Sequence, residues 1–514
     1  MEFSKFFKYL LTGLLIFLNF VIRIPSIPHE KGVDSFGIHI LAGSISIFGY
    51  AKWWVNSLSI FGLYPYSYAS SVPFILSGIS QCTGVNMEQI IWMYGVIIGL
   101  LSIFTAYMLA KAIWNNDIFK FLTAFLFSLS PGILTFSTWD ATTRGLFMVL
   151  LPLFICLLLK TRTSIKYGIL TFILFILLMA THHYFYFLIL IILSLIVITI
   201  FDRLRSHIKF VIPYNAINLA LIFGFLGAFL VPFFTGIFIE WSRYDELYMM
   251  FRRNMRYSGI PLFFAISGLT YLSLKYNKKL EEWFLLLALL FLTVFLYVQT
   301  YIHYIIIIFI CILSGVALTN IAKMARMKKY MSITIIIILL LSIGFSAFYQ
   351  HWRTHIGGAY GEWYLDEEGH AGALWIRDNI DMNKRLVGNN NLLSKRIFAI
   401  SGVPVLLKDI ASTWLIYEFT KIEDTPIVSN SPLSTSFYFN NPYVIAKSFH
   451  TAGWYRNSLQ NQEVNSKGGK SIIQRFNLSY VIEDEYYGKN RFIQSLYIKD
   501  SIYDNGKVRI WCLD

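Results

Sequence analysis

The segment "HEKGVDSFGIHILAG" (residues 29–43) contains the first side chains that are placed to do chemistry. Asp34 lies about nine residues beyond a long apolar run, and Glu30, four positions before it, is a candidate to support Asp34 or to contact a metal or the substrate. A carboxylate that stays ionised at the mouth of a cavity can accept a proton from a substrate. The following residues 37–49 predict a short amphipathic helix on the membrane surface, which would hold Asp34 near the bilayer. A solvated loop acid is the alternative interpretation.

A second acid, Asp140, lies in "STWDATTRG" between two apolar runs, four residues before Arg144. So short a connection keeps this carboxylate at the bilayer edge, close to anything bound there. It could instead cap a helix or form an ion pair with Arg144. Asp34 and Asp140 together form a candidate site for Mg²⁺ or Mn²⁺, because both ions prefer oxygen ligands. The sequence leaves metal dependence undecided.

His182 and His183, in "MATHHYFYF", should occupy another tight outer turn. Two adjacent histidines without a third ligand nearby are weak evidence for a metal. A polar or phosphate-contacting role is the interpretation that we favour for this pair.

Four arginines lie in "EWSRYDELYMMFRRNMRYSG" (residues 240–259), on the side where basic residues are normally scarce. They are Arg243, Arg252, Arg253 and Arg256. Planar guanidinium groups match the oxygens of a phosphate, so the loop is a candidate phosphate-binding element. Contacts with lipid headgroups, or neutralisation by Glu240, Asp245 and Glu246, are the alternatives.

The composition shows what must position these groups. Of 514 residues, 56% are hydrophobic, 14% are charged and 18% are aromatic. This composition is typical of a membrane protein. The net charge of +14 is explained mostly by basic loops, so we expect no nucleic-acid partner. The four cysteines have no regular spacing and predict neither disulfides nor a metal site.

Roughly eleven apolar stretches before residue 350 have the length of membrane-spanning helices. We place them near 7–25, 89–110, 120–137, 145–160, 166–181, 184–201, 210–238, 259–274, 283–299, 303–321 and 331–349. With a cytoplasmic N-terminus, every even-numbered crossing returns to a basic inner loop, as the positive-inside rule requires. An odd number of spans then puts the C-terminal part outside. The prediction is a multi-spanning helical domain (1–350) with a large first outer loop (26–88) in the cell membrane.

Residues 351–514 contain no run long enough to cross a bilayer and predict one extracytoplasmic α/β domain. The spacing of apolar residues in 365–380, with acids at its start, predicts a helix. Short β-rich runs predict strands, and "YDNGKV" (503–508) predicts a hairpin turn. The predicted strands are 385–389, 426–430, 478–484 and 507–513.

The arrangement resembles that of the GT-C membrane glycosyltransferases, which use polyprenyl- or dolichyl-phosphate-linked sugars. The resemblance covers most of the chain. It rests on Asp34 early in the first outer loop, on "ILAGSISIFG" and the passage 64–90, and on "SPGILTFSTWDATTRGLFMVLLPL". "ALWIRDNI" and "SIYDNGKVRIW" are similar to the outer domain of prokaryotic members.

This resemblance implies inverting sugar transfer at the outer membrane face, with Asp34 as catalytic base. The donor would be a lipid-linked sugar whose tail stays in the bilayer, and the acceptor a glycan, lipid or protein. The chemistry of the residues agrees, because arginines can stabilise the charge that develops on a leaving phosphate. The WWDYG motif of oligosaccharyltransferases is absent near Trp363 and Tyr364, which puts transfer to asparagine in doubt. The acidic pair of protein mannosyltransferases is absent too, since Ser35 follows Asp34.

A membrane transporter is the main alternative from another class. Ionisable residues in mid-membrane would favour it, since each costs at least about 2.5 kcal/mol there and persists mainly for function. The predicted spans are nearly free of such residues, and no inverted repeat is visible.

Overall fold

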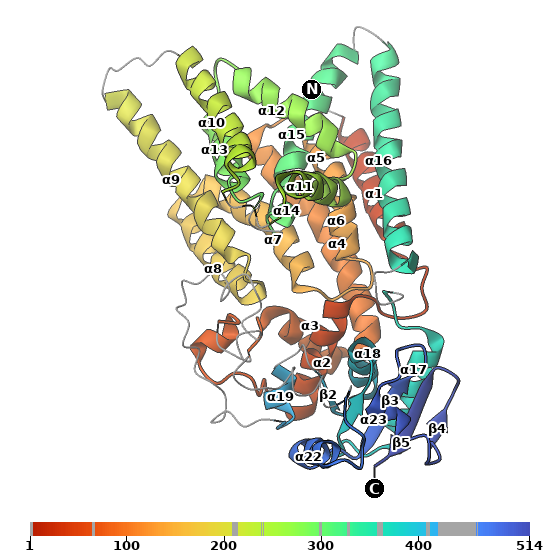
Figure 1. Ribbon diagram of the computed structural model, residues 1–514. Helices are drawn as coiled ribbons and strands as arrows, with labels where there is room; N and C mark the ends of the chain where they lie inside the picture. The colour runs from red at the N-terminus through yellow and green to blue at the C-terminus, as the bar shows by residue number, and fades with distance from the viewer. Residues whose placement is uncertain are drawn as a thin grey trace.

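The computed structural model describes residues 4–63, 67–207, 214–237, 239, 241–297, 301–325, 329–356, 363–407, 412–419, 459 and 461–513. A bundle of helices forms one end of the molecule and a smaller body with a β-sheet forms the other (Figure 1). The N-terminus lies at the far end of the bundle, opposite the C-terminal sheet.

The bundle contains a helix in each of the eleven predicted apolar stretches. Its helices are α1 (Lys5–Val21), α4 (Met87–Ile113), α5 (Asp117–Ser128), α6 (Pro131–Thr135), α7 (Thr143–Lys160), α8 (Ile165–Thr181), α9 (Phe185–His207), α10 (Tyr214–Thr235), α11 (Arg243–Ser258), α12 (Pro261–Leu274), α13 (Leu280–Thr293), α14 (Ile302–Ile305), α15 (Ile307–Ala325) and α16 (Lys329–Ile356). Apolar side chains of α4, α5, α7, α9, α13 and α15 form its core.

Within the described residues, six helices are long and apolar enough to cross a membrane, or seven if α11 and α12 count as one broken span. The number falls short of eleven because five of the helices, α1, α5, α8, α12 and α13, have 17 residues or fewer. The run 120–137, for example, is split into α5 and α6 where Ser130 caps the new helix and Pro131 begins it. α11 and α12 meet at 102°, so the arginine-bearing α11 turns away from the direction of α12.

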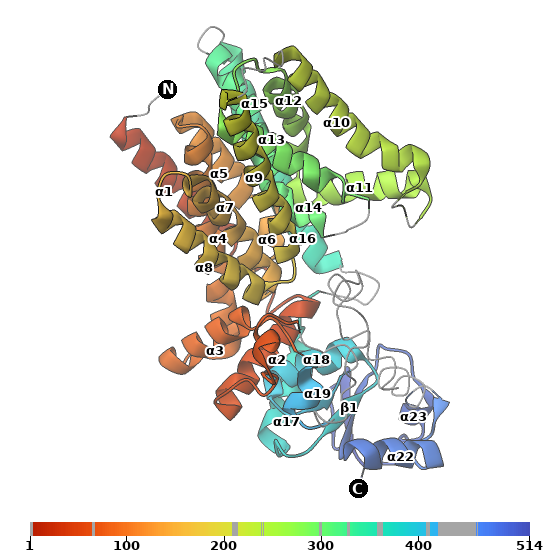
Figure 2. The ribbon, with the colours of Figure 1, turned by 90° about the vertical axis from the view of Figure 1, so that its left-hand side faces the viewer.

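The first large loop contains α2 (Val33–Phe48), the 3₁₀ turn Ser57–Ile60 and α3 (Ser71–Thr83). The prediction that α2 lies amphipathically on the surface is wrong, because residues 35–42 are all buried. Phe36, Ile40 and Leu41 pack into the same apolar core as the C-terminal sheet. The two views agree that α2 lies beside α18 (Asn391–Ser401) (Figures 1 and 2).

The C-terminal part contains α17 (Glu367–Asn379), β1 (Leu386–Gly388), α18, β2 (Val405–Leu406), α19 (Ser412–Ile416), α22 (Lys467–Phe476), β3 (Tyr480–Asp484), α23 (Arg491–Gln494), β4 (Tyr503–Asp504) and β5 (Val508–Cys512). The strand order is β2-β1-β3-β5-β4. β2, β1 and β3 run parallel, whereas β5 pairs antiparallel with β3 and β4. The predicted hairpin joins β4 to β5, and α17 begins after Asp366, whose carboxylate accepts from the Gly369 N–H. The predicted strand 426–430 lies outside the described residues.

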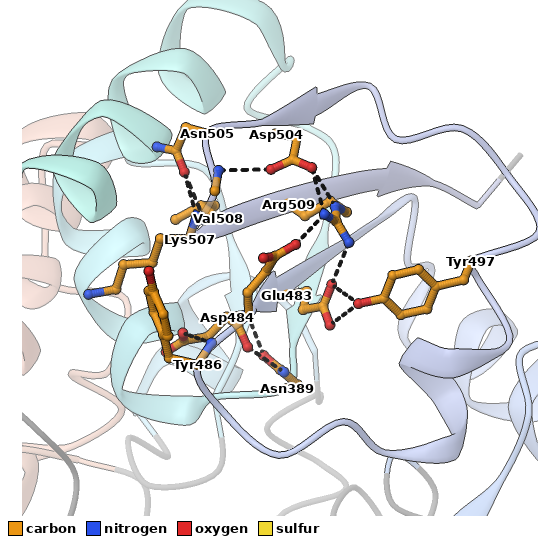
Figure 3. A network of polar contacts seen from close by, with 12 residues as sticks. Asn389, Glu483, Asp484, Tyr486, Tyr497, Asp504, Asn505, Lys507, Val508 and Arg509 are labelled. Atoms are coloured by element: carbon orange, nitrogen blue, oxygen red, sulfur yellow. Dashed lines mark hydrogen bonds and ion pairs between the residues drawn. The ribbon is translucent and has the colours of Figure 1, made fainter.

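An ion-pair network fastens the antiparallel edge of this sheet (Figure 3). Glu483 on β3 has no exposed surface, and both of its carboxylate oxygens accept from the Tyr497 hydroxyl, at 2.7 and 2.9 Å. Arg509 on β5 reaches Glu483, Glu485 and Asp504. Every acid of this network is engaged by a neighbour, so we assign it to holding β3, β5 and β4 together.

Candidate active site

Three chain segments that are far apart in sequence meet at residues 30–32. The Lys31 N–H donates to the Trp139 carbonyl at 3.2 Å, and the Gly32 N–H donates to the Trp363 carbonyl at 2.7 Å. The Leu365 N–H in turn donates to the Glu30 carbonyl at 3.0 Å. The first loop, the α6–α7 connection and the start of the C-terminal part therefore share one hydrogen-bonded junction.

Asp34 lies in the first turn of α2, where the unpaired N–H groups of a helix favour a negative charge. Its Oδ2 is 2.9 Å from Arg144 Nη2, and its side chain is 44% exposed. A cavity opens beside it, which we call the Asp34 cavity. Its wall consists of Lys31, Gly32, Val33, Asp34, Thr135, Phe136, Asp140, Thr142, Arg144, Arg353, Thr354 and Trp363. The Asp34 carboxylate thus meets both water and this cavity.

Asp140 is the second acid of the Asp34 cavity and is only 5% exposed. Its Oδ1 has no hydrogen-bond partner among the described residues, which is costly for a buried polar atom. A Cβ on Gly32, which has φ +94°, would lie 2.8 Å from Asp140 Oδ2, so only glycine fits there. Trp139, the residue before Asp140, also has a positive φ of 48°. For a residue other than glycine this conformation costs about 1 kcal/mol or more, and it is concentrated at functional sites.

The Asp140–Arg144 ion pair considered above is absent from this site, because Arg144 pairs with Asp34 instead. Asp140 is not a helix cap either, since α7 is preceded by Thr142. Burial raises the pKa of Asp140, and the charge of nearby Lys31 opposes this rise. Burial lowers the pKa of Lys31, which Asp140 counteracts. Burial outweighs this mutual attraction in both groups, so the pKa of Asp140 stays above its ordinary value and that of Lys31 stays below its own.

Glu30 is completely buried and lies outside the wall of the Asp34 cavity. Its carboxylate accepts from Ser35 Oγ at 2.6 Å and contacts His39 Nδ1 at 2.7 Å. Ser35 Oγ also accepts from the Ala141 N–H at 2.7 Å. Through Ser35, Glu30 therefore positions Ala141, the residue after Asp140. It does not line the cavity, where a contact with a substrate or metal was the role considered for it.

A buried arginine holds the other side of the same loop. Arg23, just after α1, is fully buried and donates to Ser137 Oγ at 3.0 Å, to Asn19 and to the Ser128 carbonyl at 3.0 Å. These bonds connect α1 to the chain that leads into Asp140.

The structure separates the four arginines predicted to bind phosphate. Arg243 is exposed and donates to the Phe234 carbonyl at 2.9 Å, Arg252 is exposed, and Arg253 is half-buried. Arg256 points inward, with its guanidinium 5.6 Å from the Tyr257 ring and 5.7 Å from the Tyr349 ring. Its Nε is buried without a partner among the described residues. Arg256 is thus the member of the set best placed to receive a ligand.

Arg353, which the sequence reasoning did not single out, lies in the last turns of α16 and lines the Asp34 cavity. Its Nη1 is buried, and no described residue accepts a hydrogen bond from it. Arg353 and Arg256 both lie within electrostatic range of the Tyr257 and Tyr349 hydroxyls. The signal in the sequence was a basic residue in "HWRTH", at the predicted outer end of the last span.

His182 and His183 occupy the predicted turn between α8 and α9. His182 Nδ1 accepts from the Tyr184 N–H at 3.2 Å. Burial and the charge of Arg144 lower the pKa of His183 to about 3, and burial lowers that of His182 as well. Both rings are neutral at physiological pH, so either can contact a phosphate as a neutral donor and not as a cation.

A second cavity, the α1–α16 cavity, adjoins the Asp34 cavity. Its wall consists of Ile22, Ile24, Pro25, Ser26, Ile27, Lys31, Thr138, Ala347, Gln350, His351 and Thr354. Lys31 and Thr354 belong to both walls. A polar, charged cavity therefore meets a more apolar one between the end of α1 and α16.

Asp34 and Asp140 were considered above as ligands for Mg²⁺ or Mn²⁺, and the charges of the residues around them show whether such an ion fits. Both carboxylates are present, but Lys31, Arg144 and Arg353 lie in the same wall. Cations outnumber carboxylates there, and each acid already has a cationic neighbour. Because Mg²⁺ and Mn²⁺ need several oxygen ligands of their own, this wall favours an anion over a divalent cation.

Solved structures share this fold. The oligosaccharyltransferase of Archaeoglobus fulgidus in complex with zinc and sulfate has a TM-score of 0.61 at 12% identity, over 92% of this chain and 68% of its own. Another structure of that enzyme holds an inhibitory peptide and a dolichol-phosphate. ArnT from Cupriavidus metallidurans, bound to undecaprenyl phosphate, has a TM-score of 0.55 at 11% identity, over 100% and 99% of the two chains.

The arabinofuranosyltransferase AftD from Mycobacteria gives a TM-score of 0.55 at 14% identity, over 100% of this chain and 42% of its own. No protein-family model matches the sequence, and no curated protein matches it. The three enzymes in these similar structures are all GT-C glycosyltransferases. The resemblance drawn from the sequence is therefore confirmed at the level of the fold: this chain has the architecture of a GT-C membrane glycosyltransferase.

Proposed function

We propose that the protein is an inverting glycosyltransferase that moves a sugar from a polyprenyl- or dolichyl-phosphate to an acceptor hydroxyl. The observation that carries this proposal is the Asp34 cavity, where two acidic and three basic side chains adjoin the more apolar α1–α16 cavity. A lipid-linked sugar has the same division into a polar head and an apolar tail.

The donor phosphate would bind Arg353 and Arg256. Both have a buried guanidinium nitrogen without a partner in the described part of the chain, so an anion would supply the missing acceptor. The isoprenoid tail would leave through the α1–α16 cavity. The dolichol-phosphate and undecaprenyl phosphate bound by the similar structures support a donor of this class.

Asp34 would act as the base. The acceptor oxygen attacks the anomeric carbon from the face opposite the phosphate, the carbon–oxygen bond to phosphate breaks, and Asp34 takes the hydroxyl proton. The configuration at the anomeric carbon inverts in this single displacement. Arg144 would orient the Asp34 carboxylate, while Arg353 and Arg256 would stabilise the charge left on the phosphate. Asp140 would complete the wall that orients the sugar.

For the membrane we propose the topology predicted from the basic loops, with eleven crossings, a cytoplasmic N-terminus and an extracytoplasmic domain 351–514. The position of the N-terminus and the C-terminal sheet at opposite ends of the molecule supports it (Figure 1). The Asp34 cavity then lies on the outer side, at the junction of helical domain 1–350 and C-terminal domain. The acceptor is a glycan, a lipid or a protein hydroxyl.

The replacement Asp34→Asn tests the proposed base. We expect turnover of a purified, detergent-solubilised enzyme with lipid-linked sugar to fall by about 10²- to 10⁴-fold, because the amide cannot take the proton. The melting temperature should change little, since the side chain is 44% exposed. Asp378→Asn, at an exposed acid of α17, is the matched control and should retain full activity. Near-normal turnover of Asp34→Asn would remove Asp34 from the mechanism.

A further inference from the structure

Outside the Asp34 cavity, His29, Glu88 and His370 bring one ligand atom each to within 4.8 Å of one another. His29 Nδ1 is 3.1 Å from Glu88 Oε1, and His370 Nε2 is 3.8 Å from Glu88 Oε2. The three side chains come from the first loop, from the first turn of α4 and from α17. Their side chains are 13%, 17% and 20% exposed, so the group is shielded yet reachable from water.

Zinc is the ion that this donor set suits. Two imidazole nitrogens and one carboxylate oxygen are borderline ligands that favour zinc over Mg²⁺ or Ca²⁺. At bond lengths of about 2.0–2.2 Å, tetrahedral ligand atoms lie about 3.4 Å apart. The two histidines lie 3.1 and 3.8 Å from the Oε1 and Oε2 atoms of Glu88, respectively, which is close to this value although each distance ends on a different oxygen. Side-chain rotation of His370 would close the remaining gap.

A second observation concerns the outer nitrogen of His29. While Nδ1 faces Glu88, Nε2 faces the Glu367 carboxylate at 3.3 Å. A neutral imidazole has one N–H and cannot donate to both carboxylates. A metal on Nδ1 would leave Nε2–H to donate to Glu367, which is the carboxylate–histidine–metal arrangement that orients metal ligands in proteins.

The ring of His370 stacks on that of His29, with centroids 3.7 Å apart and planes at 17°. A metal binds an imidazole nitrogen in the plane of the ring, so the rotation of His370 that closes the gap would also open this stack.

From these contacts we infer that His29, Glu88 and His370 form a zinc site that fastens the C-terminal domain to the helical bundle. Three protein ligands leave a fourth position for water. The Glu30 N–H donates to Glu88 Oε1 at 3.1 Å, and the Trp139 indole donates to the Glu88 carbonyl at 3.1 Å. The ion would therefore stabilise the chain on both sides of the Asp34 cavity, as a positioning element for Asp34 and Asp140.

The experiment measures zinc bound to the purified full-length protein by mass spectrometry, together with the absorption spectrum after Co²⁺ is substituted. We expect about one zinc per chain and visible bands typical of tetrahedral Co²⁺. His29→Gln, His370→Gln and Glu88→Gln should each lose the ion and the bands. Added zinc should raise the melting temperature of the wild-type protein and not that of these variants.

Matched controls separate this site from other metal binding. His351→Gln, at an exposed histidine of α16, and Glu368→Gln, beside Glu367, should keep the zinc. Asp34→Asn should also keep it, which separates this site from an ion in the Asp34 cavity and from the proposed function. Failure of the wild-type protein to bind zinc, or unchanged zinc in all three ligand variants, would overturn the inference. Each of the three ligands is replaced in a separate variant. If one variant does not fold, the zinc content of the other two still tests the inference.

Discussion

At the scale of residues, the ion pair of Arg144 with Asp34 determines how the two acids of the cavity differ. Asp34 has a guanidinium partner at 2.9 Å and open access to water, whereas Asp140 is buried with one oxygen unpartnered. A carboxylate that is oriented and accessible is suited to accept a proton from an incoming hydroxyl. A buried carboxylate with a free oxygen is suited to accept a hydrogen bond from a sugar hydroxyl.

The arginines give a prediction about the donor. Arg353→Gln should raise the KM for the lipid-linked sugar at least about tenfold, because a charge-assisted hydrogen bond to phosphate contributes about 1.5–3 kcal/mol. Initial rates over a range of donor concentrations measure this effect. Arg252→Gln is the control on α11, where the exposed side chain should be dispensable. A larger defect in Arg252→Gln than in Arg353→Gln would assign the phosphate to the loop arginines instead.

The buried histidines give a prediction about pH. The pKa of His183 is about 3 in the fold, against an ordinary value of 6.5, so between these values only the unfolded protein takes up the proton. The contribution of His183 to the free energy of unfolding should therefore be fully present above pH 6.5 and should be lost as the pH drops below that value. The loss is about 1.4 kcal/mol per pH unit, or about 2 kcal/mol at pH 5.

Melting temperatures in detergent at pH 7 and pH 5 measure this loss. His183→Gln should lose less stability on acidification than the wild-type protein, and His351→Gln should lose as much as the wild-type protein. Parallel losses in wild type and His183→Gln would show that the proton is taken up elsewhere.

The residue types of the site were partly predictable from the sequence. Asp34, Asp140 and Arg256 could be named because acids and arginines are unusual at the outer ends of apolar runs. Lys31 and Arg353 could not, because their proximity depends on the pairing of residues 30–32 with 363–365. The buried role of Arg23 was not predictable either, because a charged residue at the end of a membrane span usually contacts lipid headgroups.

At the scale of elements, the close contact between the start of α2 and the α6–α7 connection depends on Gly32. Gly32→Ala would place a methyl group 2.8 Å from Asp140 Oδ2 and should displace that carboxylate. We expect turnover to fall at least about tenfold, in addition to about 1 kcal/mol lost because φ is positive.

Gly49→Ala is the matched control for this change. Gly49 ends α2 with φ +77°, and a Cβ there meets no atom within 4 Å. The Gly49→Ala variant should lose about as much stability as Gly32→Ala but should keep the turnover of the wild-type protein. Equal activity of the two variants, measured as above, would show that the position of Asp140 does not matter for catalysis.

α2 also shows where reasoning from sequence failed. Its residues "GIHILAGSISIFG" have polar side chains at intervals, which resembles the pattern of a surface helix. Those polar residues are satisfied inside the protein: His39 contacts Glu30, Ser44 bonds to the Leu41 carbonyl and Ser46 contacts Ser77. A single-sequence pattern cannot distinguish water from such internal partners.

At the scale of the whole molecule, the helical bundle was predictable because apolar length is a local property, and each predicted run contains a helix. The helix ends were less predictable, so the number of long apolar helices differs from the number of runs. Strands β1, β3 and β5 lie within predicted runs. Their order was not predictable, because β1 pairs with β3 across about ninety intervening residues that leave no local signal.

Trp53 shows the same limit. In the sequence Trp53 belongs to an aromatic group with Trp54, Tyr64, Tyr66 and Tyr68, and such a group is by itself typical of the aromatic belt at a membrane interface. Tyr64 and Tyr66 lie outside the described residues. Trp53 is completely buried in the C-terminal core, while Trp54 is 42% exposed. Only the packing of the first loop onto the sheet separates these neighbours.

The insertion of α2 into the core that contains the sheet has a consequence for biogenesis. Ribosomes make α2 among the earliest segments, yet its docking surface is translated more than 300 residues later. During that interval Phe36, Ile40 and Leu41 lack their final neighbours. Assembly of the wall around Asp34 is accordingly a late event, completed only when residues 365–511 have been translated and have closed around a helix that preceded them.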